Sequence, residues 1–193
     1  MLFAGRLRHK IDIVNVSSVQ DSTGGQSLSA NVVYANVWAS IEALTGTEKF
    51  AAHEFVSQVS HQCVIRWIGP APSWVALNDY PGSFLIVDAN RNFQQAQTPG
   101  GLSGAVAPVW NTTPGGFTSD GDPSTGLTWK NLGPAGQRTG VNSGMQIWFQ
   151  GRTFQVEAVL NADERNKSLI LLCIEINDSL QTKPSPAQPG DLT

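Results

Sequence analysis

The stretch Gly151–Ile176 reads GRTFQVEAVLNADERNKSLILLCIEI, and it decides the fold class. Two apolar runs rich in β-branched residues, 153–160 and 168–176, flank the polar tetrapeptide Asp163-Glu164-Arg165-Asn166. This pattern is typical of a β-hairpin, because Val and Ile fit a pleated sheet whereas Asp and Asn favour turns. The stretch therefore predicts two antiparallel strands joined at an exposed corner.

The same corner admits a second interpretation. Asp163, Glu164 and Asp178 could form an acidic metal cluster, but Arg165 and Lys167 neutralise the charge locally, which favours a charged turn. We therefore expect no metal and no cofactor. The candidate role of the corner, residues Asp163, Glu164, Arg165 and Asn166, is contact with a neighbouring molecule.

The composition also favours an all-β protein. Of the 193 residues, 40% are hydrophobic but only 14% are charged, and Gly (19) and Pro (11) are plentiful. Few charges and many turn formers predict short strands with long connections. The formal net charge of −3 argues against a protein that grips nucleic acid by neutralising phosphates, although it permits one that DNA merely passes.

The expected location of the protein in the cell follows from two signals that the sequence does not show, a membrane-spanning stretch and a secretory signal. No apolar stretch approaches the roughly 18 residues that cross a bilayer, and the amino terminus has the wrong order of charge for a secretory signal. We expect a cytosolic, soluble protein without membrane contact. Cys63 and Cys173 lie in apolar runs, so they are expected to be buried thiols, with a disulfide between neighbouring strands as the alternative.

Further strands are predicted along the chain. Residues 8–16 alternate, with Ile11 and Ile13 on one face, and 32–41 alternate again, with Ala35 on the apolar face, so the two form a long hairpin. The polar stretch 17–31 between them is expected to be a loop. The remaining strands are expected at the following ranges: 55–68, 84–87 and 145–149.

One short α-helix is expected at 45–54, where Thr45 and Glu48 have the spacing of a capping box. It either packs over the core of the protein or contacts a neighbouring molecule. The candidate docking residues of this helix are Thr45, Glu48, Lys49 and His53. The loop at 17–31 is a second candidate for contact with a neighbouring molecule, through Gln20, Asp21, Gly24, Gly25 and Gln26.

Composition shifts between residues 70 and 139, which are dense in Gly, Pro, Ser and Thr but keep enough aromatic side chains for a small inserted β-module. The expected organisation is a discontinuous β-domain at 1–69 and 140–178, the inserted module at 70–139, and a flexible tail at 179–193. We expect the insertion at a surface hairpin tip.

No catalytic site is predicted. The histidines His9, His53 and His61 have no serine or cysteine nucleophile in a recognisable elbow nearby, and the glycines around residue 100 lack the strand and helix of a dinucleotide loop. The protein is therefore not expected to be an enzyme.

Without residues 70–139, the chain resembles the small phage head-tail joining proteins, also called head-closure, stopper or head-tail adaptor proteins. The matching segments, in order, are Ala4–Ile13, Asp21–Gly25, Val37–Glu48, Ala51-Ala52, Val59–Arg66, Gly144-Met145, Gly151–Val156 and Asn161–Asn166. Two departures stand out: the insertion, since the family runs almost directly from the strand at Arg66 to that at Gly144, and Ala43, where the family often has proline.

This resemblance implies a small β-barrel or sandwich with one helix. It implies a structural protein of the virion neck that assembles as a dodecameric ring, with the portal or adaptor on the head side and a tail terminator or tail-tube protein on the tail side. Double-stranded DNA would pass through without sequence-specific binding, and the ring would close or line the channel. The helix at 45–54 would either cover one opening of the barrel or, with the loop at 17–31, line the ring lumen or touch the neighbouring subunit. The protein would be in the host cytoplasm during assembly.

The insertion carries a second resemblance. Its segments 108–110, 118–121 and 127–133 resemble a small β-module of phage tail-fibre and virion-surface proteins. Four aromatic residues could form a surface that stacks on sugars, or could be the core of the module: Trp74, Tyr80, Trp110 and Trp129. The alternative function is accordingly a carbohydrate-binding or adhesion module on a β-scaffold.

Overall fold

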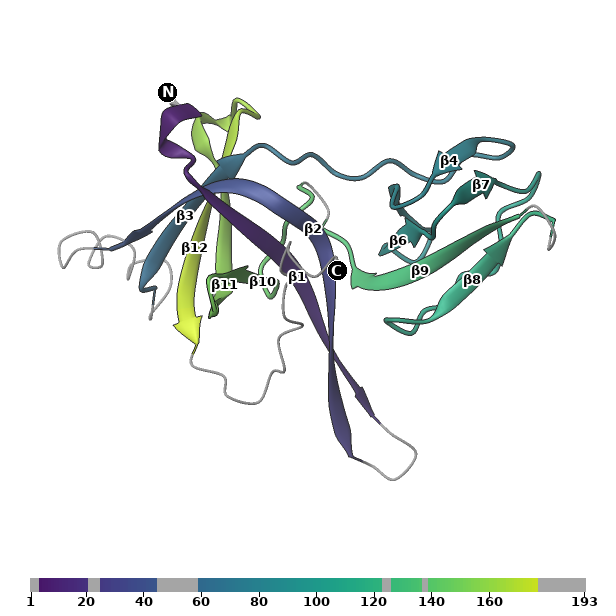
Figure 1. The fold of residues 1–193 in the computed structure, drawn as a ribbon, viewed down its shortest axis with the longest axis horizontal. Coiled ribbons are helices and arrows are strands. Elements are labelled where there is room, and N and C mark those ends of the chain that lie inside the picture. The colour runs from purple at the N-terminus through teal and green to yellow at the C-terminus, as the bar shows by residue number, and fades with distance from the viewer. Residues whose placement is uncertain (1–3, 21–24, 45–58, 123–125, 137–138, 177–193) are drawn as a thin grey trace, which may run out of the picture.

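A computed structural model describes residues 4–20, 25–44, 59–122, 126–136 and 139–176. The protein is all-β, as predicted, and six strands close into a small barrel in the order β1-β10-β11-β12-β3-β2 (Figure 1). The barrel strands are β1 (His9–Gln20), β2 (Gln26–Ala43), β3 (His61–Arg66), β10 (Gln146–Phe149), β11 (Arg152–Asn161) and β12 (Ser168–Ile176).

The closing hairpin is confirmed. Strands β11 and β12 pair antiparallel, and a 3-10 helix, η2 (Ala162–Glu164), lies at the predicted corner. The preceding strand is also confirmed as β10, which pairs with β11 across a two-residue turn at Gln150 and Gly151. Both turn residues have positive φ, 46° and 84°, the geometry that matches the twist of a β-hairpin.

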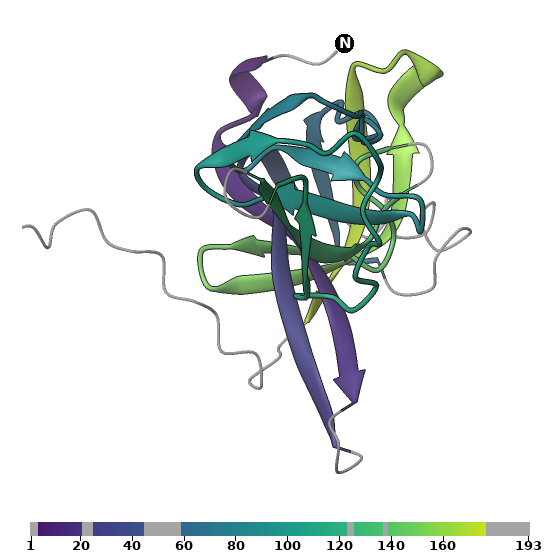
Figure 2. The same cartoon turned by 90° about the vertical axis from the view of Figure 1, so that its right-hand side faces the viewer.

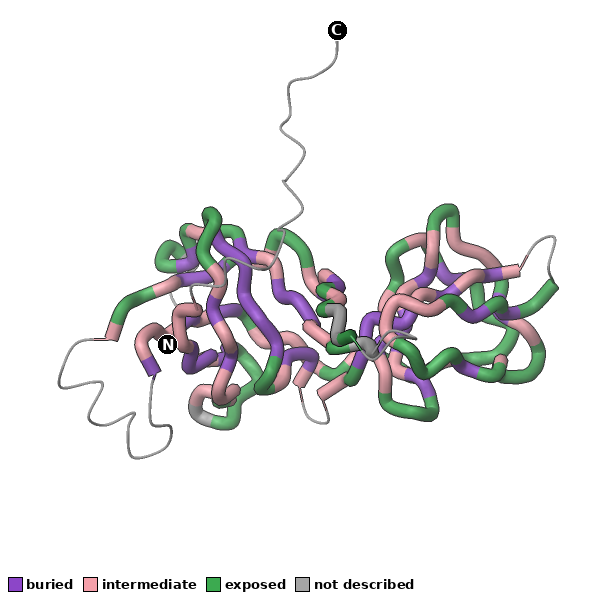
Figure 3. Tube along the Cα trace, turned by 90° about the horizontal axis from the view of Figure 1, so that it is seen from below, coloured by how far each residue is buried: buried purple, intermediate pink, exposed green. Residues whose placement is uncertain are grey.

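The barrel core is built from the alternating residues that the sequence singles out. Ile11 and Ile13 of β1 are buried, and so are Cys63 and Ile65 of β3. Figure 3 shows that buried segments run along the barrel strands and through the inserted module. Because successive side chains of a strand point to opposite faces, period-two alternation is enough to identify this inner face.

The expected loop at 17–31 is wrong in extent. Strands β1 and β2 continue to pair from Asn15 with Asn31 out to Gln20 with Gln26, and of the described residues between the two strands only Gly25 is not strand. Figure 1 shows this ribbon leaving the barrel. The polar composition misled the prediction because a ribbon that covers no core has no need of an apolar face.

The alternation predicted for 32–41 holds only in part. Val33 and Ala39 are buried, but Ala35 is exposed and Tyr34 packs against the core cluster. The register shifts between Ile11 and Ile13, and Asn36 adopts a φ of 56°. A second shift follows between Ile13 and Val14, so the disturbance is local, as at a β-bulge: Ala35 is turned outward, whereas Val37 and Ile41 still pack against the core cluster.

Two further predictions concern a helix and the strand that follows it. The α-helix expected at 45–54 lies outside them. The strand expected at 55–68 is shorter, since β3 begins at His61 and ends at Arg66. The helices of the described part are η1 (Ala4–Arg6) and η2, both 3-10, and no helix there is long and apolar enough to cross a membrane.

Residues 70–139 form two further sheets. A four-stranded sheet has the order β5-β6-β9-β8, and β4 pairs with β7. The strands are β4 (Asp79–Pro81), β5 (Leu85–Val87), β6 (Asn92–Ala96), β7 (Gly100–Leu102), β8 (Phe117–Asp120) and β9 (Leu127–Pro134). These sheets lie beside the barrel in Figure 1, and in the turned view of Figure 2 they lie in front of it.

The site of the insertion differs from the expected hairpin tip. Strands β3 and β10, which flank the insertion, are not neighbours in the barrel, so the insertion lies in a crossover connection. Its two ends nevertheless meet, because the amide of Gly140 donates to the carbonyl of Ile68 at 2.9 Å. The division into separate domains stays a prediction.

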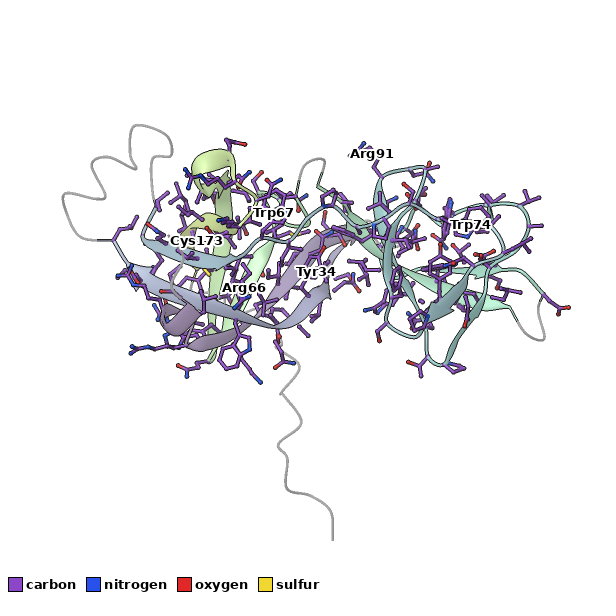
Figure 4. All side chains as sticks on the ribbon, turned by 90° about the horizontal axis from the view of Figure 1, so that it is seen from above. Tyr34, Arg66, Trp67, Trp74, Arg91 and Cys173 are labelled. Atoms are coloured by element: carbon purple, nitrogen blue, oxygen red, sulfur yellow. The ribbon has the colours of Figure 1, made fainter. Side chains whose placement is uncertain are left out.

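The barrel and the inserted module share one hydrophobic cluster. Phe93 of β6 and Leu132 of β9 are buried in the same cluster as the barrel residues. The ring of Phe93 meets that of Tyr34 edge to face, with centroids 6.2 Å apart, and Figure 4 shows Tyr34 on the side of the barrel that faces the module. The module is therefore packed onto the barrel and is not a loosely tethered appendage.

Candidate interaction surfaces

The first candidate surface is the ribbon of β1 and β2. Gln20 and Gln26 are its last paired residues, and Gly25 is exposed beside them. Asp21 and Gly24 lie outside the described residues. Gln20 and Gln26 thus lie at the end of a preformed ribbon, where a loop was expected. Their contact with a lumen or a neighbour stays a prediction.

The second candidate, the docking helix, cannot be placed. Its residues lie outside the described part of the chain: Thr45, Glu48, Lys49 and His53. Their proposed role stays a prediction.

The third candidate is the corner between β11 and β12, where Glu164, Arg165 and Asn166 are exposed. Asn161 organises the turn, since its Nδ2 donates to Asn166 Oδ1 at 2.8 Å and its Oδ1 accepts from the Asn166 amide at 3.2 Å. Glu164 and Asn166 both have a φ of 53°, which a side chain rarely adopts. The corner is a shaped, solvent-facing turn, and the side chain of Asp163 is not described.

The fourth candidate, the aromatic surface of the insertion, is corrected by the structure. Trp129 is 0% exposed, Tyr80 3% and Trp110 9%, and Trp74 is partly buried against them. The rings of Tyr80 and Trp110 both meet that of Trp129 edge to face. These rings form the core of the module, the other interpretation that the sequence allowed, because a domain this small has few other large apolar groups to bury.

The sequence analysis missed the polar anchor of this core, Asp120. Its carboxylate is 2% exposed and accepts three hydrogen bonds, from Trp74 Nε1 at 2.7 Å, from Trp129 Nε1 at 2.9 Å and from the amide of Gly104 at 2.8 Å. A buried charge is tolerated only with such partners. In the sequence Asp120 lies in Thr-Ser-Asp-Gly, which signals only a turn.

A second missed feature is a charged cluster on the barrel surface. Arg152 donates from Nε and Nη2 to the two carboxylate oxygens of Glu175, at 2.6 and 2.7 Å. The bidentate bond from Arg152 lowers the pKa of Glu175 and raises that of Arg152. Arg152 Nη2 also lies 3.1 Å from His61 Nε2. The pairing register of strands β3, β11 and β12 brings His61, Arg152 and Glu175 together, and no single segment of the sequence reveals this register.

A third missed residue, Asn15, joins the barrel to the module. Its Nδ2 donates to the carbonyls of Leu132 at 3.0 Å and Pro134 at 3.1 Å. Gly133 lies between these carbonyls with a φ of 93°, and a Cβ there would come within 2.7 Å of the Asn15 amide nitrogen. Only glycine fits this approach of β9 to β1.

The described residues offer little for chemistry. Cys63 and Cys173 are free, buried thiols, as the favoured interpretation predicted, and burial raises the pKa of Cys63 to about 12. In the part of the chain that the structure describes, no group of three or more His, Cys, Asp or Glu side chains is arranged to hold a metal ion.

Comparison with known proteins finds a similar family for the amino-terminal part of the chain. The family model described as phage head completion protein matches residues 2–95, which span η1 to β6. No curated protein matches the chain significantly. The match confirms the family resemblance, whereas the separate resemblance of the inserted module is not confirmed. A structural role in the phage virion, in a family that is not one of enzymes, follows from the match. Over residues 2–95 the chain is similar to the phage head completion protein family.

Proposed function

We propose that the protein forms a ring in the neck of a bacteriophage and joins the DNA-filled head to the tail. The portal or its adaptor would contact one face of the ring, and a tail terminator or tail-tube protein the other. The observation that carries this proposal is the match of residues 2–95 to the head completion family, on strands that close into a barrel with strands from the far side of the insertion.

The ring would close or line the channel through which DNA leaves the head. A chain with a net charge of −3 suits this role, since tight binding of DNA depends on cations that neutralise phosphates. The carbohydrate-binding alternative loses its main support because the aromatic side chains that suggested it pack into the core of the module.

Removal of the gene from the phage tests the proposal. The expected result is DNA-filled heads and complete tails that accumulate separately, which electron microscopy of the lysate would detect. Supply of the protein from a plasmid should restore tailed particles. Normal numbers of tailed, infectious particles without the gene would contradict the proposal.

A further inference from the structure

Strands β1, β2 and β3 are neighbours in the barrel (Figure 1), and their outer face carries a tryptophan with a cation on either side. Trp38 of β2 pairs directly with Lys10 of β1. On the other side of β2, Ala39 pairs with Ile65, and both are fully buried. The residues next to this pair, Trp38 on β2 and Arg66 on β3, therefore lie beside each other and point outward.

The side chains around this tryptophan are exposed. Arg8 lies two residues before Lys10 and so on the same face of β1. We call Arg8, Lys10, Trp38 and Arg66 the Trp38 patch; the three cations are exposed, and Trp38 is 51% exposed. Lys10 Nζ lies over the Trp38 ring, 5.2 Å from its centroid. Within the part of the chain that the structure describes, none of the three cations forms a salt bridge.

An exposed indole among unpaired cations has the composition of a binding contact. Tryptophan side chains are highly buried on average, as Trp110, Trp129 and Trp148 are in this chain. Trp and Arg are also the residues that most often dominate the energy of protein contacts. A partner that covers the Trp38 patch would bury the indole and supply the missing counter-charges.

The charge of the patch selects an acidic partner, since each of its cations can gain a carboxylate on binding. Two carboxylates border the patch on opposite sides. Asp12 follows Lys10 along β1, whereas Glu42 lies in the other direction, beyond Trp38 on β2. A DNA duplex, with about one phosphate per 1.7 Å of its axis, would also press phosphates against these two carboxylates. A protein segment with separate carboxylates can meet the cations and avoid that repulsion.

A second copy of this chain is a poor match for the patch. The sequence contains one pair of adjacent acidic residues, Asp163-Glu164, and Arg165 follows it directly. Asp120 and Asp122 are also close in sequence, but Asp120 is buried. The acidic segment is therefore expected on a different protein.

We propose that the Trp38 patch binds an acidic segment of a neighbouring neck protein. Carboxylates of that segment contact Arg8, Lys10 and Arg66, and an apolar side chain between them packs on Trp38. This inference rests on the proposed position in the neck, and it names the chemistry of the partner that meets this side of the barrel.

Photo-crosslinking at residue 38 identifies the partner. Trp38 is replaced by a photoreactive phenylalanine analogue in protein that complements a phage lacking the gene, and purified particles are irradiated. The expected product joins residue 38 to another virion protein, at a position with Asp or Glu directly beside it, as mass spectrometry of the joined peptides would detect. The matched control carries the analogue in place of Phe117, an aromatic side chain of the module that is 58% exposed, and should not join the same segment.

The possible outcomes separate this inference from the proposed function. A crosslink from residue 38 to a second copy of the chain, to DNA or to a segment without acidic residues overturns the inference and leaves the neck role standing. The same holds if particles that contain the protein give no crosslink. Absence of the protein from purified particles overturns both.

Charge reversal gives a second measurement. Lys10→Glu and Arg66→Glu should each lower the yield of tailed particles at least about tenfold, because like charges would meet at the contact. The isolated protein should keep its melting temperature, since both side chains are exposed. Lys10→Arg and Arg66→Lys keep the charge and are the matched controls, with yields close to wild type.

A charge swap then tests the contact itself. Replacement of the crosslinked segment's carboxylate by lysine should restore the yield of particles that carry Arg66→Glu, because the pair regains opposite charges. Wild-type yields from both Lys10→Glu and Arg66→Glu would overturn the proposal.

Discussion

At the scale of single residues, Asp120 decides whether the inserted module holds its core. Asp120→Ala would leave two indole N–H groups and one amide without an acceptor in a buried site. We expect a loss of roughly 3 kcal/mol in the free energy of unfolding. Urea denaturation followed by tryptophan fluorescence measures it, because Trp74 and Trp129 report on this site directly.

The matched control for this prediction is Asp79→Ala. Asp79 is an exposed carboxylate in the same module, so its removal should change the free energy of unfolding by less than about 0.5 kcal/mol. Equal effects of the two substitutions would show that Asp120 is not an anchor.

The stability of the barrel should depend on pH through Glu175. The bond from Arg152 lowers the pKa of Glu175 below its ordinary 4.5, so the folded state binds a proton less readily than the unfolded state. The stabilisation is therefore complete above the unfolded pKa and is lost as the pH falls through the lower, folded one. We expect Glu175→Gln to flatten the acid side of the stability curve, as measured by urea midpoints across this range.

This effect should be modest, because the pair is exposed to solvent and is screened by salt. At neutral pH the variant should be slightly less stable than the wild type, and the two curves should converge in acid. A wild-type curve no steeper than that of Glu175→Gln below the ordinary pKa would contradict the assignment.

At the scale of elements, the contact between β1 and β9 couples the barrel to the module. Asn15→Ala would remove both hydrogen bonds to β9 and leave the carbonyls of Leu132 and Pro134 without their donor. We expect a cost of about 1 to 2 kcal/mol and faster hydrogen exchange in Leu127–Pro134. Ser18→Ala, at an exposed position on the same strand, should leave the exchange of β9 unchanged; equal acceleration by both would refute the coupling.

The elements also show how far sequence reasoning reaches. The hairpin of β11 and β12 could be predicted because each strand buries one face, which imposes the alternation. The strand character of residues 17–31 could not be predicted, because the part of the β1–β2 ribbon outside the barrel covers no core and its polar residues resemble those of a loop. The exposure of Ala35 was also hidden, since it follows from a local shift in register with β1.

The candidate sites show the same limit. The corner at 163–166 was foreseen because turn residues act locally. Asp120 and Asn15 were missed because their partners lie far away in sequence, as in the bond from Trp74 to Asp120. The aromatic residues of the insertion were recognised as important, but only the structure distinguishes a core from a surface.

At the scale of the whole molecule, the barrel joins strands from both sides of the insertion. Strand β1 pairs with β10, and β3 with β12, so the amino-terminal strands need the carboxy-terminal hairpin to close. The family match ends at residue 95, while the barrel continues to Ile176. The fold therefore places the closing hairpin in the same barrel as the matched strands, which gives the proposed ring subunit a complete barrel.

An electron cryomicroscopy reconstruction of the virion neck tests the central claim most directly. The account predicts a ring of copies of this chain between the portal complex and the tail, with the barrel and the adjoining module resolved in every subunit. A neck built without this chain, or its presence only elsewhere in the particle, would contradict the account.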